Sequence, residues 1–186
     1  MKIKDHLYFA PGVSFHGLNV YAPDILGKFR RRIEGYYLEP ARLLTKEEHA
    51  FAATVLLVSC LDALARYDSI NPKNSGGNRK RYIDWLNANM PKVFSENFAT
   101  IFYDDIRCGA VHEARIKNGC VFTFYTGSAI FCENNIMAVN PERLADHVTD
   151  ALNQFCEART ADPSKLKKFQ DDLKDDFNIE LKTSNI

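Results

Sequence analysis

The chain has 186 residues, of which 46% are hydrophobic and 26% are charged, with 9 Gly and 7 Pro. This composition is typical of folded soluble domains and excludes a collagen-like, low-complexity or disordered chain. The 24 basic and 24 acidic side chains balance, so net charge predicts no general attraction to nucleic acid or to an anionic membrane. We expect a single domain over residues 1–186, because a chain of this length can bury one sizeable core.

The balanced charge hides a difference between the two halves of the chain. Residues 1–93 carry 14 basic and 9 acidic side chains, whereas residues 94–186 carry 10 and 15. The halves are therefore +5 and −5, and an anionic partner is expected to meet the first half.

The five cysteines favour a reducing compartment, because none forms a C-x-x-C pair and an odd number does not suit a secreted disulfide framework. No signal peptide is expected, since Asp5, His6 and the Pro11-Gly12 pair interrupt the apolar stretch at the start. The longest uncharged apolar helical run, Ala50 to Leu61, is shorter than the roughly 20 residues that span a bilayer. We expect a soluble, cytoplasmic protein with no membrane partner.

The segment before Pro23 is mixed and rich in turns. The first clear helix begins at Pro23-Asp24, with proline at the first helical position, and extends to about Leu44. Thr45-Lys46-Glu47-Glu48 is interpreted as a capping box, in which the threonine hydroxyl and the glutamate carboxylate satisfy free amides of a new helix. That helix runs to about Tyr67 and is apolar nearly all round, which predicts a central buried helix into which only Asp62 intrudes as a charge.

Two further helices follow a loop that contains Asn71-Pro72 and Ser75-Gly76-Gly77-Asn78. The first is short and basic, beginning at Arg79-Lys80-Arg81. The second covers residues 92 to about 112, because apolar residues recur there at spacings of three and four. These residues are Phe94, Phe98, Ile101, Phe102 and Ile106.

After Gly119 the pattern changes from helical to extended, which predicts a small antiparallel β-hairpin or meander at about 120–139 with turns at 126–128 and 134–135. Asn140-Pro141 then starts a helix with an N-cap, and Asp162-Pro163 starts a final helix over about 162–178. The predicted fold class is mainly α, a helical bundle with one small β element.

Most motifs that carry chemistry are missing from the sequence. There is no glycine-rich nucleotide-binding loop, no H-E-x-x-H and no G-x-S-x-G. A metal site could be imagined from Cys108, His112, Cys120 and Cys132, but their spacings of 4, 8 and 12 match no standard zinc pattern. We therefore expect no metal and no cofactor.

The end of the predicted 92–112 helix carries an arginine five positions before a histidine. His112 suits proton transfer near neutral pH, and Arg107 offers a planar, permanently charged donor for a phosphate that gains charge during RNA cleavage. Residues five apart point about 140° from each other on a straight helix. The two side chains would therefore converge through a helix end near Gly109 or across a two-fold axis.

The phrase Phe102-Tyr103-x-x-x-Arg107-Cys108-Gly109-x-x-His112, the strands after it and the Asn-Pro before the next helix resemble a bacterial subgroup of the HEPN family (higher eukaryotes and prokaryotes nucleotide-binding), whose members carry an R-x(4–6)-H motif. The resemblance covers about residues 24–158 and leaves the final helix outside. It implies a helical bundle, a homodimer with a composite site and, in many members, metal-independent RNA cleavage in toxin or defence systems. A protein antitoxin or regulatory partner would accompany such a role.

The position after the arginine separates two functional hypotheses. Active family members usually carry Asn, Asp or His there, and this chain carries Cys108. The first hypothesis is a HEPN-type endoribonuclease in which Arg107 and His112 are catalytic. The alternative is a catalytically silent HEPN module that binds RNA, a nucleotide or a partner protein, and a third hypothesis is a purely structural helical dimer.

Each candidate residue also has a structural interpretation. Arg107 could pair with Asp104 or Asp105, and His112 could be a core or capping histidine. Glu113 could orient His112 or be solvated. Asp62 and the two basic runs also allow both a functional and a structural interpretation. Asp62 could reach Arg107 or pair with Arg66 four residues on, and the runs Arg79-Lys80-Arg81 and Arg30-Arg31-Arg32 could contact phosphates or form solvated helix faces.

Overall fold

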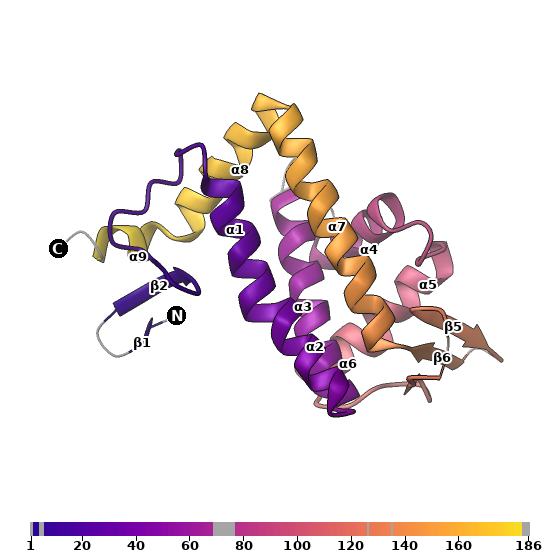
Figure 1. Ribbon diagram of the computed structural model, residues 1–186. Helices are drawn as coiled ribbons and strands as arrows, with labels where there is room; N and C mark the ends of the chain where they lie inside the picture. Colours follow the sequence, from indigo (N-terminus) through magenta and orange to yellow (C-terminus); the bar gives the residue numbers. More distant parts are fainter. Residues whose placement is uncertain (1, 4–5, 69–76, 126, 135, 184–186) are drawn as a thin grey trace. The chain divides into compact units, whose positions relative to one another are not determined.

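The computed structural model describes residues 2–3, 6–68, 77–125, 127–134 and 136–183. The chain is mainly helical with two small sheets, which confirms the predicted mainly α class with a small β element (Figure 1). Its residues divide into two compact units, one formed by Met1–Tyr37 with Leu152–Ile186 and the other by Leu38–Ala151. The single-domain organisation stays a prediction.

The first unit contains a sheet that the sequence did not indicate. Strands β1 (Lys2–Ile3), β2 (His6–Ala10) and β3 (Val13–Ser14) pair in antiparallel order. Helix α1 (Ile25–Ile33) packs on β2. The unit also holds the end of helix α7 (Pro141–Ala161), together with helices α8 (Pro163–Asp176) and α9 (Asn178–Thr183). Its core includes two clusters of aromatic rings, Phe29 with Phe155 and Phe169, and Phe9 with Phe15 and Phe177.

The helix predicted from Pro23-Asp24 to about Leu44 is confirmed from Ile25 on, but it contains a π-helical turn. The predicted start is wrong, because Asp24 is the N-cap and Pro23 lies before the helix. Helix α1 continues through a π-helical segment, Glu34–Leu38, into α2 (Glu39–Lys46). Pro40 explains the turn, because proline has no N–H to donate to the carbonyl of Tyr36 and its ring would crowd that carbonyl. A π-helical turn, with its i→i+5 hydrogen bonds, lets the chain remain helical past such a residue.

The predicted capping box at Thr45 is wrong. The Thr45 hydroxyl donates back to the carbonyl of Arg42, so this residue belongs to the last turn of α2. The amide of His49 donates to Leu44 O and the amide of Glu48 donates to Thr45 O, with Glu48 at φ 56°. These are the two bonds of a Schellman motif, which ends a helix and starts none.

The second unit is built around α3 (Ala50–Asp68), which contacts α2, α4 and α6. The predicted central buried helix is confirmed, because Leu57, Val58, Leu61 and Leu64 are completely buried. An 18-residue window of α3 has a mean hydropathy of 1.5, so by length and composition the helix could also cross a membrane. Half of that window is buried inside the fold, and the absence of a membrane partner stays a prediction.

The predicted basic helix is α4 (Gly77–Asn89). Of the predicted loop before it, residues 71–76 lie outside the described residues, and Gly77 and Asn78 belong to α4. The predicted 92–112 helix begins later, at Glu96. It consists of α5 (Glu96–Ile101), a π-helical segment called η2 (Phe102–Arg107) and α6 (Cys108–His112).

A three-stranded sheet in the second unit follows α6. Its strands are β4 (Val121–Phe122), β5 (Ile130–Glu133) and β6 (Ile136–Val139), in the order β4-β6-β5. The predicted hairpin is confirmed for β5 and β6, but β4 pairs with β6 in parallel, so the antiparallel meander is wrong for this strand. Strand β6 buries Met137 and Val139 completely and takes the centre, whereas Val121 of β4 is 45% exposed at an edge.

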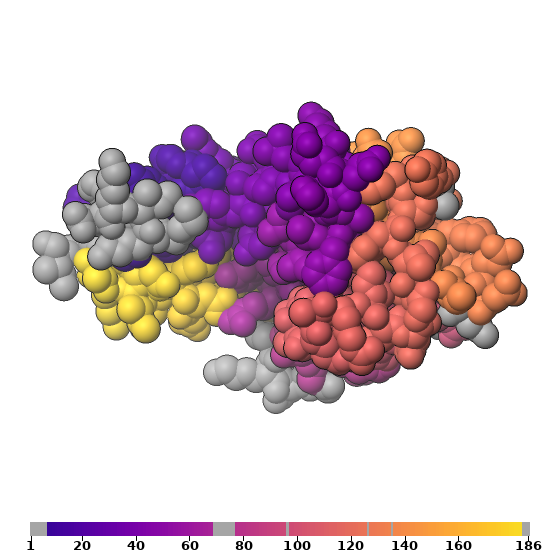
Figure 2. Space-filling view, turned by 90° about the horizontal axis from the view of Figure 1, so that it is seen from below, coloured from indigo at the N-terminus to yellow at the C-terminus, as the bar shows by residue number. Residues whose placement is uncertain are grey.

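The sheet formed by β4, β5 and β6 contacts the start of α3 and connects to α7. The ring of Phe122 lies 6.1 Å from that of Phe51, and Figure 2 shows the start of α3 beside the segment after α6. Strand β6 leads directly into α7 (Figure 1).

The predicted caps are confirmed: Asn140 Oδ1 accepts from two amides of α7, and Asp162 Oδ1 accepts from two amides of α8. The predicted turn residues 126 and 135 lie outside the described residues.

Burial of a thiol in α3 predicts a loss of stability at alkaline pH. Burial raises the pKa of Cys60 from 9.0 to about 12, so the native state keeps a proton that the unfolded chain loses above pH 9. The free energy of unfolding should therefore fall as pH rises from 9 towards 12, by up to about 1.4 kcal/mol per pH unit from this group. Urea unfolding across this range should give a shallower slope for Cys60→Ala, and parallel curves would contradict the prediction.

Candidate functional site

Arg107 and Asp62 form the centre of the candidate site in the second unit. Arg107 is the last residue of the π-helical segment, and Asp62 lies on α3. The Nε and Nη2 atoms of Arg107 donate to Asp62 Oδ2 at 2.9 and 2.7 Å. The Arg107 side chain is 14% exposed and that of Asp62 27%, so the ion pair is largely removed from solvent.

His112 completes the cluster. Arg107 Nη1 lies 2.8 Å from His112 Nε2. The guanidinium can only donate, so a hydrogen bond here needs a lone pair on Nε2, as in the tautomer that carries its hydrogen on Nδ1. The two side chains therefore meet within one chain. The expected helix end near Gly109 is wrong, because α6 continues to His112, and the reach of the guanidinium bridges the angle between the two positions.

Tyr103, for which we predicted no role from the sequence, lies beneath the guanidinium. The Arg107 Cζ atom is 5.2 Å from the centre of the Tyr103 ring, and the Tyr82 ring packs edge-on against that of Tyr103, with ring centres 5.3 Å apart. Burial raises the pKa of both phenols. The spacing of four residues between Tyr103 and Arg107 was the signal available, since such residues share a helix face.

The charge of Arg107 is stabilised where it sits. Burial lowers the pKa of the guanidinium, but the hydrogen bonds and the negative charge of Asp62 outweigh this effect, so its pKa is raised overall. Cys108 is half-buried beside it, with Sγ 4.0 Å from Arg107 Nη1. Arg107 is therefore a fixed cation, with donors engaged by Asp62 and by His112.

The other acidic candidates have different partners. Asp104 accepts from Arg79 Nε at 2.9 Å and Nη2 at 2.6 Å, and this hydrogen bonding lowers the pKa of Asp104. Asp105 accepts from the side chain of Asn118 at 2.8 Å. Of the alternatives open from the sequence, the structure thus selects Asp62 as the partner of Arg107.

Two of the three residues of the predicted RNA-contacting run form ion pairs within the chain. Arg79 forms the two-pronged contact with Asp104 on the η2 segment, and Lys80 pairs with Asp84 one turn along α4. Arg81 is half-buried. Contact of these three residues with RNA stays a prediction.

Glu113 follows His112 directly, but its contacts are with cations of the next segment. Its carboxylate lies 2.6 Å from Lys117 Nζ and 2.8 Å from Arg115 Nη2. The hydrogen bond from Lys117 is the main reason why the pKa of Glu113 is lowered. The geometry therefore ties Glu113 to the turn after α6.

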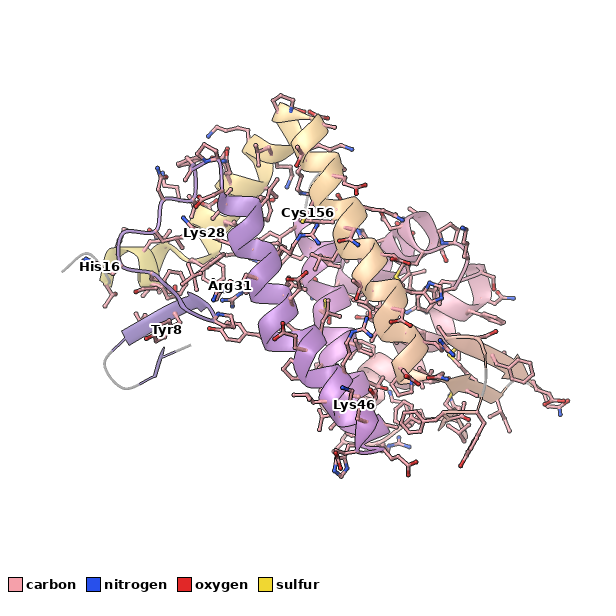
Figure 3. All side chains as sticks on the ribbon, in the orientation of Figure 1. Tyr8, His16, Lys28, Arg31, Lys46 and Cys156 are labelled. Carbon is pink, nitrogen blue, oxygen red and sulfur yellow. The ribbon has the colours of Figure 1, made fainter. Side chains whose placement is uncertain are left out.

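In the first unit, the three arginines of α1 have separate environments. Arg30 donates to Asn153, and Arg32 donates to the carbonyl of Phe9. Arg31 is exposed and lies close to Gly12, and Figure 3 places it on α1 with Lys28. The Arg30-Arg31-Arg32 run therefore does not form a uniform solvated face.

No group of three His, Cys, Asp or Glu side chains placed to hold a metal ion occurs among the described residues. Of the four residues considered for zinc, Cys108 and His112 both lie against Arg107 Nη1, a permanent cation. Cys120 is buried, and burial raises the pKa of its thiol.

Comparison of the chain with protein-family models, with curated proteins and with solved structures finds no match. The resemblance to the HEPN family therefore rests on the residues of the motif and their order along the chain.

Gly109 allows the chain to turn back over α6. Its carbonyl accepts from the amides of Glu113 and Arg115, and Ala114 between them has φ 52°. A Cβ on Gly109 would lie 2.4 Å from the Arg115 carbonyl oxygen, which is backbone and has no side-chain freedom to move away. Only glycine fits this close approach.

Gly109→Ala should therefore destabilise the protein, by about 1–3 kcal/mol, because the turn after α6 must shift to admit a methyl group. Gly27→Ala is the matched control: Gly27 lies in α1 with nothing within 4 Å of its added Cβ. There the exchange should raise stability by about 0.5–1 kcal/mol, as for Gly to Ala in helix interiors. Thermal unfolding of the two variants checks the pair, and equal effects would contradict the steric argument.

Proposed function

We propose that the protein is a HEPN-type, metal-independent endoribonuclease in which His112 transfers the proton and Arg107 binds the scissile phosphate. The observation that carries the proposal is the 2.8 Å contact between Arg107 Nη1 and His112 Nε2, with the guanidinium held by Asp62. A proton-transfer group and a phosphate ligand are thereby within reach of the same phosphodiester. The HEPN resemblance of the motif supports the same assignment.

The chemistry needs no other group type. Neutral His112 accepts the proton of a ribose 2′-OH, the 2′-oxygen attacks phosphorus, and the 5′-oxygen leaves. The products are a 2′,3′-cyclic phosphate and a 5′-OH end. Arg107 donates to a non-bridging phosphate oxygen, where negative charge grows in the transition state. Asp62 acts as a positioning residue, because it holds the guanidinium from the far side.

The proposal includes a homodimer, which the family resemblance implies. A two-fold axis near α6 would bring two copies of His112 to one cleft, so that one accepts the 2′-OH proton and the other protonates the leaving oxygen. His112 is exposed, so its ring is accessible to a second copy. Toxin or defence activity with an antitoxin partner remains part of this proposal.

One observation favours the silent alternative, a module that binds RNA, a nucleotide or a partner protein. Asp62 engages two of the three nitrogens of Arg107, and only 14% of the side chain is exposed. A guanidinium held in this way offers a phosphate fewer donors than a free one. The same pairing is what a purely structural site would need.

His112→Ala is the sharpest test of the proposed activity. The ring is exposed, so its loss should change the free energy of unfolding by less than about 0.5 kcal/mol. Loss of the positioned base should slow cleavage of end-labelled single-stranded RNA by about 10²–10⁴-fold. Excess EDTA should leave the wild-type rate unchanged.

His49→Ala is the matched control, since His49 is an exposed histidine before α3. Arg107→Ala should also abolish cleavage, but it leaves the Asp62 carboxylate without its cation and should cost about 1–3 kcal/mol of stability. If the purified protein cuts RNA and His112→Ala cuts equally well, the site is wrongly assigned.

Cys108→Asn distinguishes the enzyme from the silent module. An asparagine amide at this position restores the polar residue usual in active members and can accept from Arg107 Nη1, which lies 4.0 Å from the thiol. If the natural protein is silent, this variant should gain RNA cleavage, whereas an enzyme that is already active should show no gain. Cys132→Asn, at a half-exposed thiol on β5, is the control for the exchange itself.

A further inference from the structure

The contact between Arg107 and His112 can exist in only one protonation state. Arg107 Nη1 keeps its hydrogens, so the 2.8 Å contact needs a lone pair on His112 Nε2. A proton on Nε2 would replace that hydrogen bond by two N–H groups and two positive charges facing each other. The two charges would repel each other, and the exposed ring has room to turn away from the guanidinium.

We infer that Arg107 and His112 form a proton-linked oxyanion site: a tetrahedral oxyanion enters between them together with one proton, which His112 Nε2 takes up. One oxygen of the anion accepts from Arg107 Nη1, and a second accepts from the new N–H of His112. This inference rests on the proposed function in using the same two residues, and it adds that the site is closed by its own hydrogen bond when no anion is bound.

The charges around the site make the anion necessary for this state. Arg107 is already paired with Asp62, so one positive charge is balanced before His112 takes up a proton. The protonated ring adds a second charge that the oxyanion balances, with charge-assisted hydrogen bonds on both sides. Binding therefore replaces one hydrogen bond, between the guanidinium and a neutral ring, by two hydrogen bonds in which both partners carry charge.

Other ionisable groups surround α6. From α3 there are Asp62 and, one turn on, Arg66. From η2 there are Asp104 with its partner Arg79, Asp105, and Tyr103 beneath the guanidinium. From α6 and the turn after it there are the Cys108 thiol and Glu113 with Arg115 and Lys117. All of them remain in a variant that changes His112 alone, so their contribution to any pH dependence can be subtracted.

His112→Gln is that variant. Its amide oxygen can still accept from Arg107, but it takes up no proton in the neutral range. Sulfate is the probe, because it stays a dianion from pH 6 to pH 9, and chloride at equal ionic strength is the reference. Isothermal titration calorimetry in buffers of different ionisation enthalpy counts the protons bound with sulfate. NMR of the His112 ring reports the site directly.

For the wild type, sulfate binding should be accompanied by proton uptake, and the affinity should rise as pH falls, by at most about tenfold per pH unit, which is the limit for one proton. His112→Gln should bind sulfate with no such uptake, and His49→Gln should behave as the wild type. Equal proton uptake by the wild type and His112→Gln would overturn the inference. Failure of sulfate to bind or to move the His112 ring signals would overturn it as well.

The two proposals can fail separately. RNA cleavage that depends on His112, without proton-linked sulfate binding, would leave the enzyme proposal intact and overturn the proton-linked oxyanion site. Proton-linked sulfate binding without cleavage under any condition would support the oxyanion site and make the protein a phosphate-binding module.

Discussion

The ion pair between Asp62 and Arg107 is the constraint on which the second unit depends. Helix α3 is so apolar that its carboxylate cannot be covered without a cation, because burying an uncompensated charge is expensive. Both guanidinium bonds go to one oxygen of Asp62. This contact links α3 to the end of the η2 segment, and the same guanidinium contacts His112 on α6.

The π-helical turns show how the chain reaches this arrangement without breaking its helices. The first precedes Pro40 and accommodates this proline, which would disrupt the interior of an α-helix. The second ends at Arg107, and it buries Phe102, Tyr103 and Ile106 while Arg107 faces Asp62. Wider turns of this kind occur often at functional sites, because they re-aim side chains inside a continuous helix.

Several charged side chains of the second unit form ion pairs with each other. Arg79 holds Asp104, Lys117 holds Glu113, and Arg42 holds Asp146. These exposed pairs contribute little to stability, but each of them joins a cation and an acid that could otherwise pair elsewhere. Asp62 pairs with Arg107, and His112 has the guanidinium as its neighbour. Arg107 is therefore engaged on both sides by contacts within the chain.

The sequence by itself determined what depends on near neighbours. The caps at Asn140 and Asp162 need only a side-chain oxygen and the next few amides, and the buried character of α3 follows from its composition. The side-chain types of Arg107 and His112 suit phosphate binding and proton transfer, and these roles stay a prediction. The tertiary structure decided what depends on segments that are distant in sequence. Asp62 and Arg107 are 45 residues apart, and the alternatives at Asp104 and Asp105 were equally good until Arg79 and Asn118 occupied them. Thr45 ends a helix because the chain before it is still helical, and β4 pairs with β6 because the more deeply buried β6 takes the centre of the sheet.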